Sequence, residues 1–169
     1  MLSPSQALNR PLNRQALAPS ISEGEKVTRR IGFLMGNVGL LIAQLAISEL
    51  SEPLEICPIP FTANWLLGLI NLRGNLVPVF DLHQLLQMER SVEKGQLLIL
   101  GQGQNAGAIV IEELPKHLTF TEADKLNSPP PMPSIIKPFT ASGYEKNGQI
   151  WFNFDHLGFF EHLATKVGG

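Results

Sequence analysis

The fold of this chain is decided by the stretch Leu66-Leu-Gly-Leu-Ile-Asn-Leu-Arg-Gly-Asn-Leu-Val-Pro-Val-Phe-Asp-Leu82. Its two apolar runs, 66–72 and 76–80, flank the connection Arg73-Gly74-Asn75. Glycine supplies the positive φ that a tight turn needs, and apolar runs of this length on either side of a turn are typical of paired strands. The stretch therefore predicts a β-hairpin.

A short helix is predicted directly after this hairpin. Asp81 is well placed as its N-cap, and three leucines recur at helical spacing within 81–89. The same order of strands, turn and Asp-capped helix is found again around Asp155, ahead of the apolar residues of 157–164. The chain is therefore expected to contain the same kind of unit twice.

Short β-type runs separated by turn signals account for most of the remaining chain. They lie at 31–35, 38–42, 46–50, 54–59, 96–100, 108–111, 118–120, 135–142 and 149–154. Many short strands with glycine at the turns are typical of small barrels rather than of a βαβ sheet. Two barrels of about 60 to 75 residues each would account for the length, and we expect them to share an interface because neither has a large core alone.

Composition excludes several classes of protein. The 169 residues include 13 Lys and Arg against 15 Asp and Glu, a formal charge of −2, and 44% of them are hydrophobic. This apolar content argues against wholesale disorder, and the charge argues against a nucleic-acid binder driven by electrostatics. Only 17% of the residues are charged, which we interpret as a sign of surface that faces other proteins.

The N-terminal residues 1–28 are predicted to be a flexible arm, and the folded part is predicted to span 29–169 with a boundary between the barrels near residue 93. Residues 1–30 carry a formal charge of +3, whereas 31–169 carry −5. An organelle transit peptide is an alternative, but three prolines within the first 19 residues break the amphipathic helix that such a peptide needs. A basic arm that contacts an acidic partner also stays open.

A search for catalytic or metal-binding motifs gives no enzyme, cofactor or metal hypothesis. Gly101-Gln-Gly-Gln-Asn-Ala-Gly107 lies between two predicted strands, so it is interpreted as a hairpin turn and not as a phosphate-binding loop. Asp81 and Asp155 are better explained as helix caps than as a catalytic pair. The four histidines lack the spacing of zinc ligands: His83, His117, His156 and His162.

Cys57 is the only cysteine, which excludes an intrachain disulfide and fits a reducing compartment. It lies in an apolar run, so we expect a buried, inert thiol. The longest apolar stretch, 38–47, has ten residues, well short of the roughly 20 that a membrane-spanning helix needs. No direct membrane insertion is expected.

Arg73 is the only Lys or Arg between residues 31 and 88. One interpretation is an internal ion pair, with Asp81 as the suggested partner. The other is a guanidinium presented to a partner's carboxylate, for which arginine has the right forked geometry. The same segment also contains Glu49, Glu52 and Glu55.

The segments Gly68-Leu-Ile-Asn-Leu-Arg-Gly74 and Pro78-Val-Phe-Asp-Leu82 match the pattern GxxNLRGxxxPVxDL. This pattern resembles the signature of CheW-like coupling domains, and the resemblance extends over about residues 29–164. It implies a mainly β fold, in which two intertwined five-stranded SH3-like β-barrels pack together with short helices.

The resemblance implies a non-catalytic adaptor that couples methyl-accepting chemoreceptors to a CheA-type histidine kinase. The receptor's signalling tip would bind in a groove between the barrels, and the kinase's regulatory domain would bind edge to edge. Such a protein would be cytoplasmic and recruited to membrane-associated chemoreceptor arrays. The segments Trp65-Leu-Leu-Gly68 and Val77-Pro-Val-Phe-Asp81 are also similar to members of type IV pilus (twitching) pathways. The alternatives are a small barrel that binds single-stranded nucleic acid, which the charge disfavours, and a scaffold that competes with other coupling proteins.

By position in the motif, the resemblance also implies site residues, with Arg73 as the receptor-facing cation. The expected receptor-binding residues are Asn71, Leu72, Arg73 and Gly74. The residues expected to support the groove are Gly68, Leu69, Pro78, Val79 and Asp81.

Overall fold

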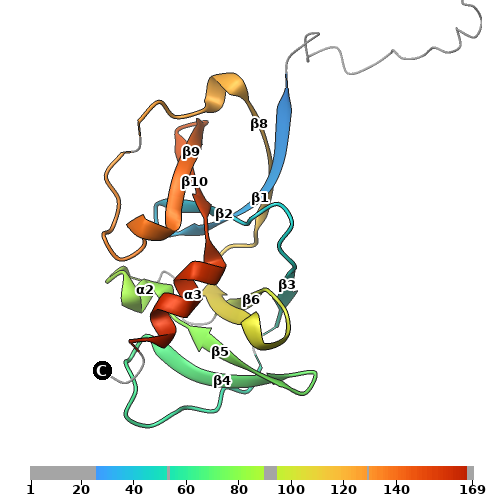
Figure 1. The fold of residues 1–169 in the computed structure, drawn as a ribbon, viewed down its shortest axis with the longest axis vertical. Coiled ribbons are helices and arrows are strands. Elements are labelled where there is room, and N and C mark those ends of the chain that lie inside the picture. Colours follow the sequence, from blue (N-terminus) through green and yellow to red (C-terminus); the bar gives the residue numbers. More distant parts are fainter. Residues whose placement is uncertain (1–25, 53, 90–94, 129, 167–169) are drawn as a thin grey trace, which may run out of the picture.

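The computed structural model describes residues 26–52, 54–89, 95–128 and 130–166. These residues form two five-stranded sheets and few, short helices, which confirms the predicted mainly β fold class (Figure 1). Residues 1–25 of the predicted N-terminal arm lie outside the described residues, and the first strand begins at Val27. Among the described residues, no helix has the length and apolarity required to span a membrane.

The first sheet has the strand order β8-β1-β2-β10-β9. Its strands are β1 (Val27–Met35), β2 (Val38–Leu41), β8 (Lys116–Thr121), β9 (Thr140–Lys146) and β10 (Gln149–Phe154). The second sheet has the order β3-β6-β7-β5-β4. Its strands are β3 (Ser48–Ser51), β4 (Leu66–Leu72), β5 (Asn75–Phe80), β6 (Gln96–Leu100) and β7 (Gly107–Ile111).

The helices are short, and one of them follows the last strand. They are α2 (Leu82–Leu85), α3 (His156–Ala164) and three 3-10 helices: η1 (Gly103–Asn105), η2 (Glu122–Asp124) and η3 (Lys137–Phe139). The helix predicted over 81–89 is shorter than expected, because the backbone of Gln87 adopts a positive φ of 57° that a helix cannot continue through. Both predicted caps are confirmed: Asp81 accepts a hydrogen bond from the amide of Gln84, and Asp155 accepts one from the amide of Gly158.

The two sheets have the same plan but interleave along the chain. Across each sheet, one parallel pair of strands lies next to antiparallel pairs. In the first sheet β10 runs parallel to β2, and in the second β5 runs parallel to β7. The chain leaves the first sheet after β2, builds the whole second sheet with β3–β7, and returns with β8–β10. A boundary near residue 93 therefore does not separate the sheets, since it falls between α2 and β6, within the run of strands that builds the second sheet.

The two sheets share one large apolar core. It combines Phe33 and Leu40 of the first sheet, Leu98 and Ile109 of the second, and Phe159 of α3. Because side chains alternate along a strand, the neighbours of Leu98 and Ile109 point the other way, into a second cluster inside the second sheet. Strands β6 and β7 are thus buried on both faces, and α3 covers the junction of the sheets (Figure 1).

Candidate functional site

The hairpin of β4 and β5 ends in a two-residue turn that presents Arg73. Leu72 pairs with Asn75, and the residues between them, Arg73 and Gly74, have φ values of 50° and 87°. Two consecutive positive φ values are typical of the type I′ turns that suit the twist of a hairpin. The side chain of Asn71 accepts a hydrogen bond from the amide of Gly74 at 3.0 Å, so Asn71 fixes the shape of the turn.

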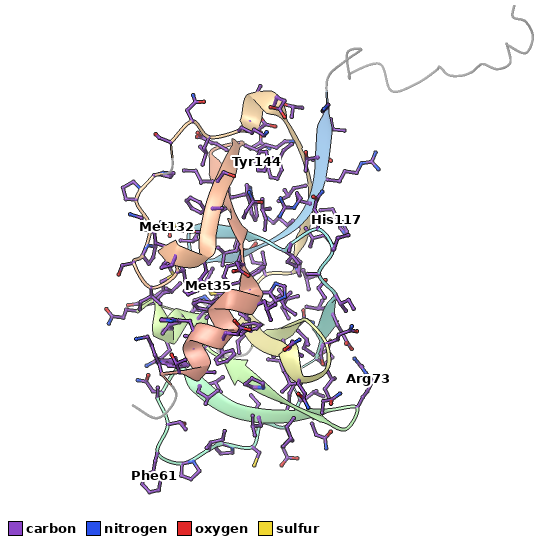
Figure 2. All side chains as sticks on the ribbon, in the orientation of Figure 1. Met35, Phe61, Arg73, His117, Met132 and Tyr144 are labelled. Atoms are coloured by element: carbon purple, nitrogen blue, oxygen red, sulfur yellow. The ribbon has the colours of Figure 1, made fainter. Side chains whose placement is uncertain are left out.

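Arg73 makes a forked ion pair with Glu49 of β3. Its two terminal nitrogens donate to the two carboxylate oxygens at 3.1 and 2.7 Å. The hydrogen bonds from Arg73 lower the pKa of the Glu49 carboxyl, and those to Glu49 raise the pKa of the Arg73 guanidinium. The Arg73 side chain is nevertheless 69% exposed. The partner is Glu49 and not Asp81, and the pair lies on the surface and not inside the protein (Figure 2).

Gly68 and Leu69 hold a neighbouring segment against the hairpin. Cys57 and Leu69 form an isolated antiparallel bridge through two backbone hydrogen bonds of 2.8 and 2.9 Å. Gly68 has a φ of 143°, and a Cβ added there would lie 2.7 Å from the carbonyl carbon of Cys57. Position 68 therefore needs glycine for both conformation and space.

Cys57 itself is exposed, so the expectation of a buried thiol is wrong. The run 54–59 does not become an inner strand. Apart from the bridge at Cys57, its described residues form no part of either sheet, so the apolar sequence does not bring the thiol into a core.

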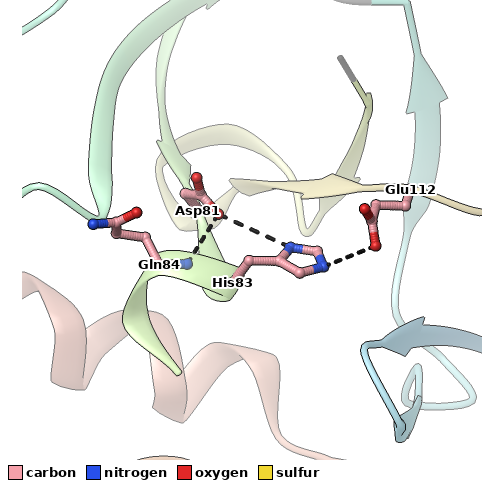
Figure 3. Close-up of polar contacts among 4 residues, drawn as sticks. All are labelled: Asp81, His83, Gln84 and Glu112. Carbon is pink, nitrogen blue, oxygen red and sulfur yellow. Dashed lines mark hydrogen bonds and ion pairs between the residues drawn. The ribbon is translucent and has the colours of Figure 1, made fainter. Parts of the chain in front are cut away.

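The remaining support residues lie below the turn and inside the fold. Pro78 pairs with Leu69, and Val79 is fully buried in the apolar cluster of the second sheet. Asp81 is buried at the far end of the hairpin, where it caps α2 (Figure 3). The tip, 71–74, is thus exposed except for the half-buried Leu72. The support is buried at Gly68, Val79 and Asp81 and half-buried at Leu69 and Pro78.

Asp81 also lies next to a buried histidine (Figure 3). His83 is 2% exposed, its Nε2 lies 3.2 Å from Oε1 of Glu112, and its Nδ1 lies 4.0 Å from Oδ1 of Asp81. The ring therefore connects α2 to the chain directly after β7. A group this deeply buried holds elements together and is closed to a substrate in solution. Among the described residues, no cluster of His, Cys, Asp and Glu is arranged to hold a metal ion.

The segment 43–49, which links the two sheets, separates two pockets on the surface. One, of about 270 Å³, lies between the sheets and is lined by Arg30, Ile31, Ala46, Ser48 and His117, among others. The other, also about 270 Å³, lies against the hairpin tip and is lined by Ile47, Glu49, Leu72 and Arg73, among others. Over residues 46–49 the side chains alternate, with Ala46 and Ser48 in the first pocket and Ile47 and Glu49 in the second.

Exposed apolar side chains accompany these pockets. Leu45 is 97% exposed and Ile47 is 51% exposed, and Leu50 on β3 is also exposed. Ile47 lies in the tip pocket beside the Arg73–Glu49 pair, and Leu45 and Leu50 are exposed on the same stretch of chain. This combination is typical of protein-binding surfaces.

Sequence reasoning placed the tip residues 71–74 but missed Glu49 and Ile47 as parts of the same surface. The sequence already contained a signal for Glu49, because it is one of the few acids in a stretch with a single cation. It could not select Glu49 over Glu52 or Glu55, since the choice depends on how β3 lies beside the hairpin.

Comparisons with known proteins agree with this architecture. The chain is 29% identical over 114 residues to the chemotaxis protein CheW of Helicobacter pylori (strain ATCC 700392 / 26695), which covers 66% of this chain and 69% of that protein. Its fold is similar to the crystal structure of the scaffolding protein TtCheW from Thermoanaerobacter tengcongensis, with a TM-score of 0.60 and 19% identity over 75% of this chain and 87% of that one. The model of the CheW-like domain matches residues 30–164, and the chain therefore belongs to the CheW-like domain family.

Proposed function

We propose that this protein is a non-catalytic adaptor that couples methyl-accepting chemoreceptors to a CheA-type histidine kinase. It would act in the cytoplasm, at membrane-associated receptor arrays. The observation that carries the proposal is the family match over residues 30–164, together with an exposed, rigid Arg73 at the tip of the family's signature hairpin. The proteins that this chain resembles are described as a chemotaxis protein and as a scaffolding protein.

The geometry supports receptor binding at the segment 43–50 and the hairpin tip. A helical receptor tip presents apolar and charged side chains on one face, and this surface offers apolar contacts beside a forked guanidinium. Asn71 and Gly74 hold the turn, so Arg73 is presented without a large loss of backbone freedom on binding. The kinase's regulatory domain would bind a different edge of the molecule.

The first experiment measures binding of the full chain to a receptor signalling-tip fragment and, separately, to the kinase regulatory domain. Arg73→Glu is expected to weaken receptor binding by about tenfold or more, as for an arginine at the centre of an interface. The matched control is Lys137→Glu, an equally drastic charge reversal at an exposed lysine of η3. Loss of binding in both variants, or in neither, contradicts the assignment, and wild-type protein that binds neither partner contradicts the adaptor role.

A charge swap separates a partner-facing arginine from a purely structural ion pair. In Arg73→Glu/Glu49→Arg, the pair can re-form with its polarity reversed. If Arg73 acts only by holding β3 to the hairpin, the double variant recovers wild-type receptor affinity. If the guanidinium itself meets the receptor, affinity stays low although the protein has wild-type stability.

Two pathways are proposed, chemotaxis and twitching. Chemotaxis is supported by the description of the Helicobacter pylori relative. A type IV pilus-dependent (twitching) role rests on the sequence resemblance of the segments 65–68 and 77–81. Deleting the gene and scoring swimming and twitching separately distinguishes the two. Loss of neither form of movement contradicts both.

A further inference from the structure

The first sheet is curved but does not form a closed barrel, because its end strands β8 and β9 do not pair with each other. Phe120 of β8 stacks on Tyr144 of β9 with ring centroids 4.3 Å apart, and a few polar contacts among the described residues also connect these ends. Lys125 forms an isolated bridge with Tyr144, the amide of Leu126 donates to the carbonyl of Gly143, and the ammonium group of Lys146 donates to the carbonyl of Thr119. A gap therefore remains beside the first half of β8.

This gap is a groove of about 520 Å³, which we call the β8 groove. Trp151, only 3% exposed, lines it together with the half-buried Leu34 and Leu118. Its cationic and titratable lining residues are Lys116, His117 and Lys146. Figure 2 shows His117 on β8, on the side of the molecule away from the 130s loop that carries Met132.

The β8 groove is basic in a protein whose overall charge is −2. None of the described acidic residues lines it. Lys146 lies 5.9 Å from the ring of Phe120 and donates to a neutral carbonyl, and it forms no ion pair with a described acid. Lys116 approaches Glu113 only at 4.0 Å, and both side chains are more than half exposed. The groove therefore offers two ammonium groups for a new carboxylate partner.

The outer edge of β8 also offers backbone groups. β8 pairs with β1 along one side only, and the carbonyl of Thr119 faces away from that partner toward Lys146. An unpaired strand edge is a template for an added strand. The carbonyl of Thr119 accepts its hydrogen bond from the flexible side chain of Lys146 and not from the backbone of a neighbouring strand. A second strand placed here would extend the first sheet from β8.

We propose that the β8 groove binds an extended acidic segment of a partner protein as an added strand along β8. The side chains on one face of the segment would meet the groove, with acidic ones at Lys116 and Lys146 and apolar ones at Leu34 and Leu118. They share a face because Lys116 and Leu118 lie two residues apart on β8 and so point to the same side. The added strand would replace Lys146 at the carbonyl of Thr119 and free its ammonium group for a carboxylate. This surface is separate from the hairpin tip that carries Arg73.

The experiment titrates the full ¹⁵N-labelled chain with a blocked synthetic peptide of repeating Glu-Ser-Leu-Ser, which places Glu and Leu in turn on one face of a strand. One control peptide carries Gln in place of every Glu, and a second carries N-methyl groups on the amides of one edge. We expect shifts of the backbone amides of 116–119 and of the indole N–H of Trp151, weaker binding at higher salt, and at least a threefold loss of affinity with either control peptide. Shifts confined to other regions, or equal binding of all three peptides, would overturn the proposal.

Variants test the lysines directly. Lys116→Gln and Lys146→Gln are each expected to lower the affinity for the Glu-Ser-Leu-Ser peptide by about threefold to tenfold. Lys137→Gln is the control that leaves this affinity unchanged. Lys116→Gln removes only an exposed side chain, so it remains informative if Lys146→Gln alters the packing of Phe120. Equal affinity of Lys116→Gln and Lys137→Gln would refute the role of the groove. So would binding of phosphatidylglycerol vesicles through these lysines without binding of the peptide.

Discussion

Gly68→Ala tests whether the signature hairpin depends on a glycine for space as well as for conformation. In the wild type, the segment at Cys57 approaches so closely that an added Cβ would lie 2.7 Å from its carbonyl carbon and 2.9 Å from Cγ2 of Ile56. Real Cβ atoms do not come this close, so Cys57 must move away and its two backbone hydrogen bonds to Leu69 must weaken.

The expected loss of stability has two parts. A non-glycine residue at a φ of 143° costs about 1–3 kcal/mol. The two hydrogen bonds between Cys57 and Leu69 contribute about 0.5–1.5 kcal/mol each. Gly68→Ala should therefore lower the free energy of unfolding by about 2–6 kcal/mol.

Gly74→Ala is the matched control. Gly74 also has a positive φ, 87°, but a Cβ there meets nothing within 4 Å. This variant should cost only the backbone strain, about 1–2 kcal/mol. The difference between the two variants isolates the close approach of Cys57.

Urea unfolding measures both variants. With a slope of about 2 kcal/mol/M, the midpoint of Gly68→Ala should lie about 0.5–2 M below that of Gly74→Ala. Hydrogen exchange then localises the effect, because the amide of Leu69 should lose protection in Gly68→Ala and keep it in Gly74→Ala. Equal midpoints, or unchanged protection of Leu69 in Gly68→Ala, would refute the steric argument.

Three further predictions concern α3 and its cap. Phe159→Ala removes a ring with 0% exposure from the shared core and should cost about 3–5 kcal/mol of unfolding free energy. Leu157→Ala, at 42% exposure, should change the unfolding free energy by less than about 0.5 kcal/mol. Similar urea midpoints for the two variants would contradict this prediction. Asp155→Ala removes the N-cap and should cost about 1 kcal/mol, and an unchanged midpoint would contradict the capping role. Burial lowers the pKa of His156, although the nearby Asp155 opposes the shift, so the unfolded chain binds the proton more readily and stability should fall as the pH drops through and below the ordinary histidine range. His156→Gln should lose less stability than the wild type between about pH 8 and about pH 5, and an equal or greater loss would contradict this.

Much of the local structure could be predicted from the sequence because it depends on neighbouring residues. The strand at 96–100 and the strand at 149–154 have the predicted bounds, and both Asp caps are confirmed. The helix after Asp81 is shorter than its leucine spacing predicts, because the backbone reverses at Gln87. A periodic pattern reports which face is apolar, but it does not report where the backbone must turn to reach the next strand.

The low content of charged residues has two causes, an apolar protein-facing surface and strands that are buried on both faces. Exposed apolar residues such as Leu45 and Ile47 agree with a protein-facing surface. However, β6 and β7 are apolar on both faces because one face packs in the shared core and the other inside the second sheet. Composition adds these two contributions together, and only the fold distinguishes them.

By itself, the sequence determined the β4–β5 hairpin, the two capped helices, the mainly β class and the family signature, since each depends on contacts within a few residues or on a motif that is contiguous in the chain. The tertiary structure decided what lies far apart in sequence and close in space. It interleaved the sheets so that no boundary near residue 93 divides them, and it exposed Cys57. It also placed Glu49, 24 residues away, beside Arg73. Such pairings depend on how whole strands pack, and no local pattern encodes them.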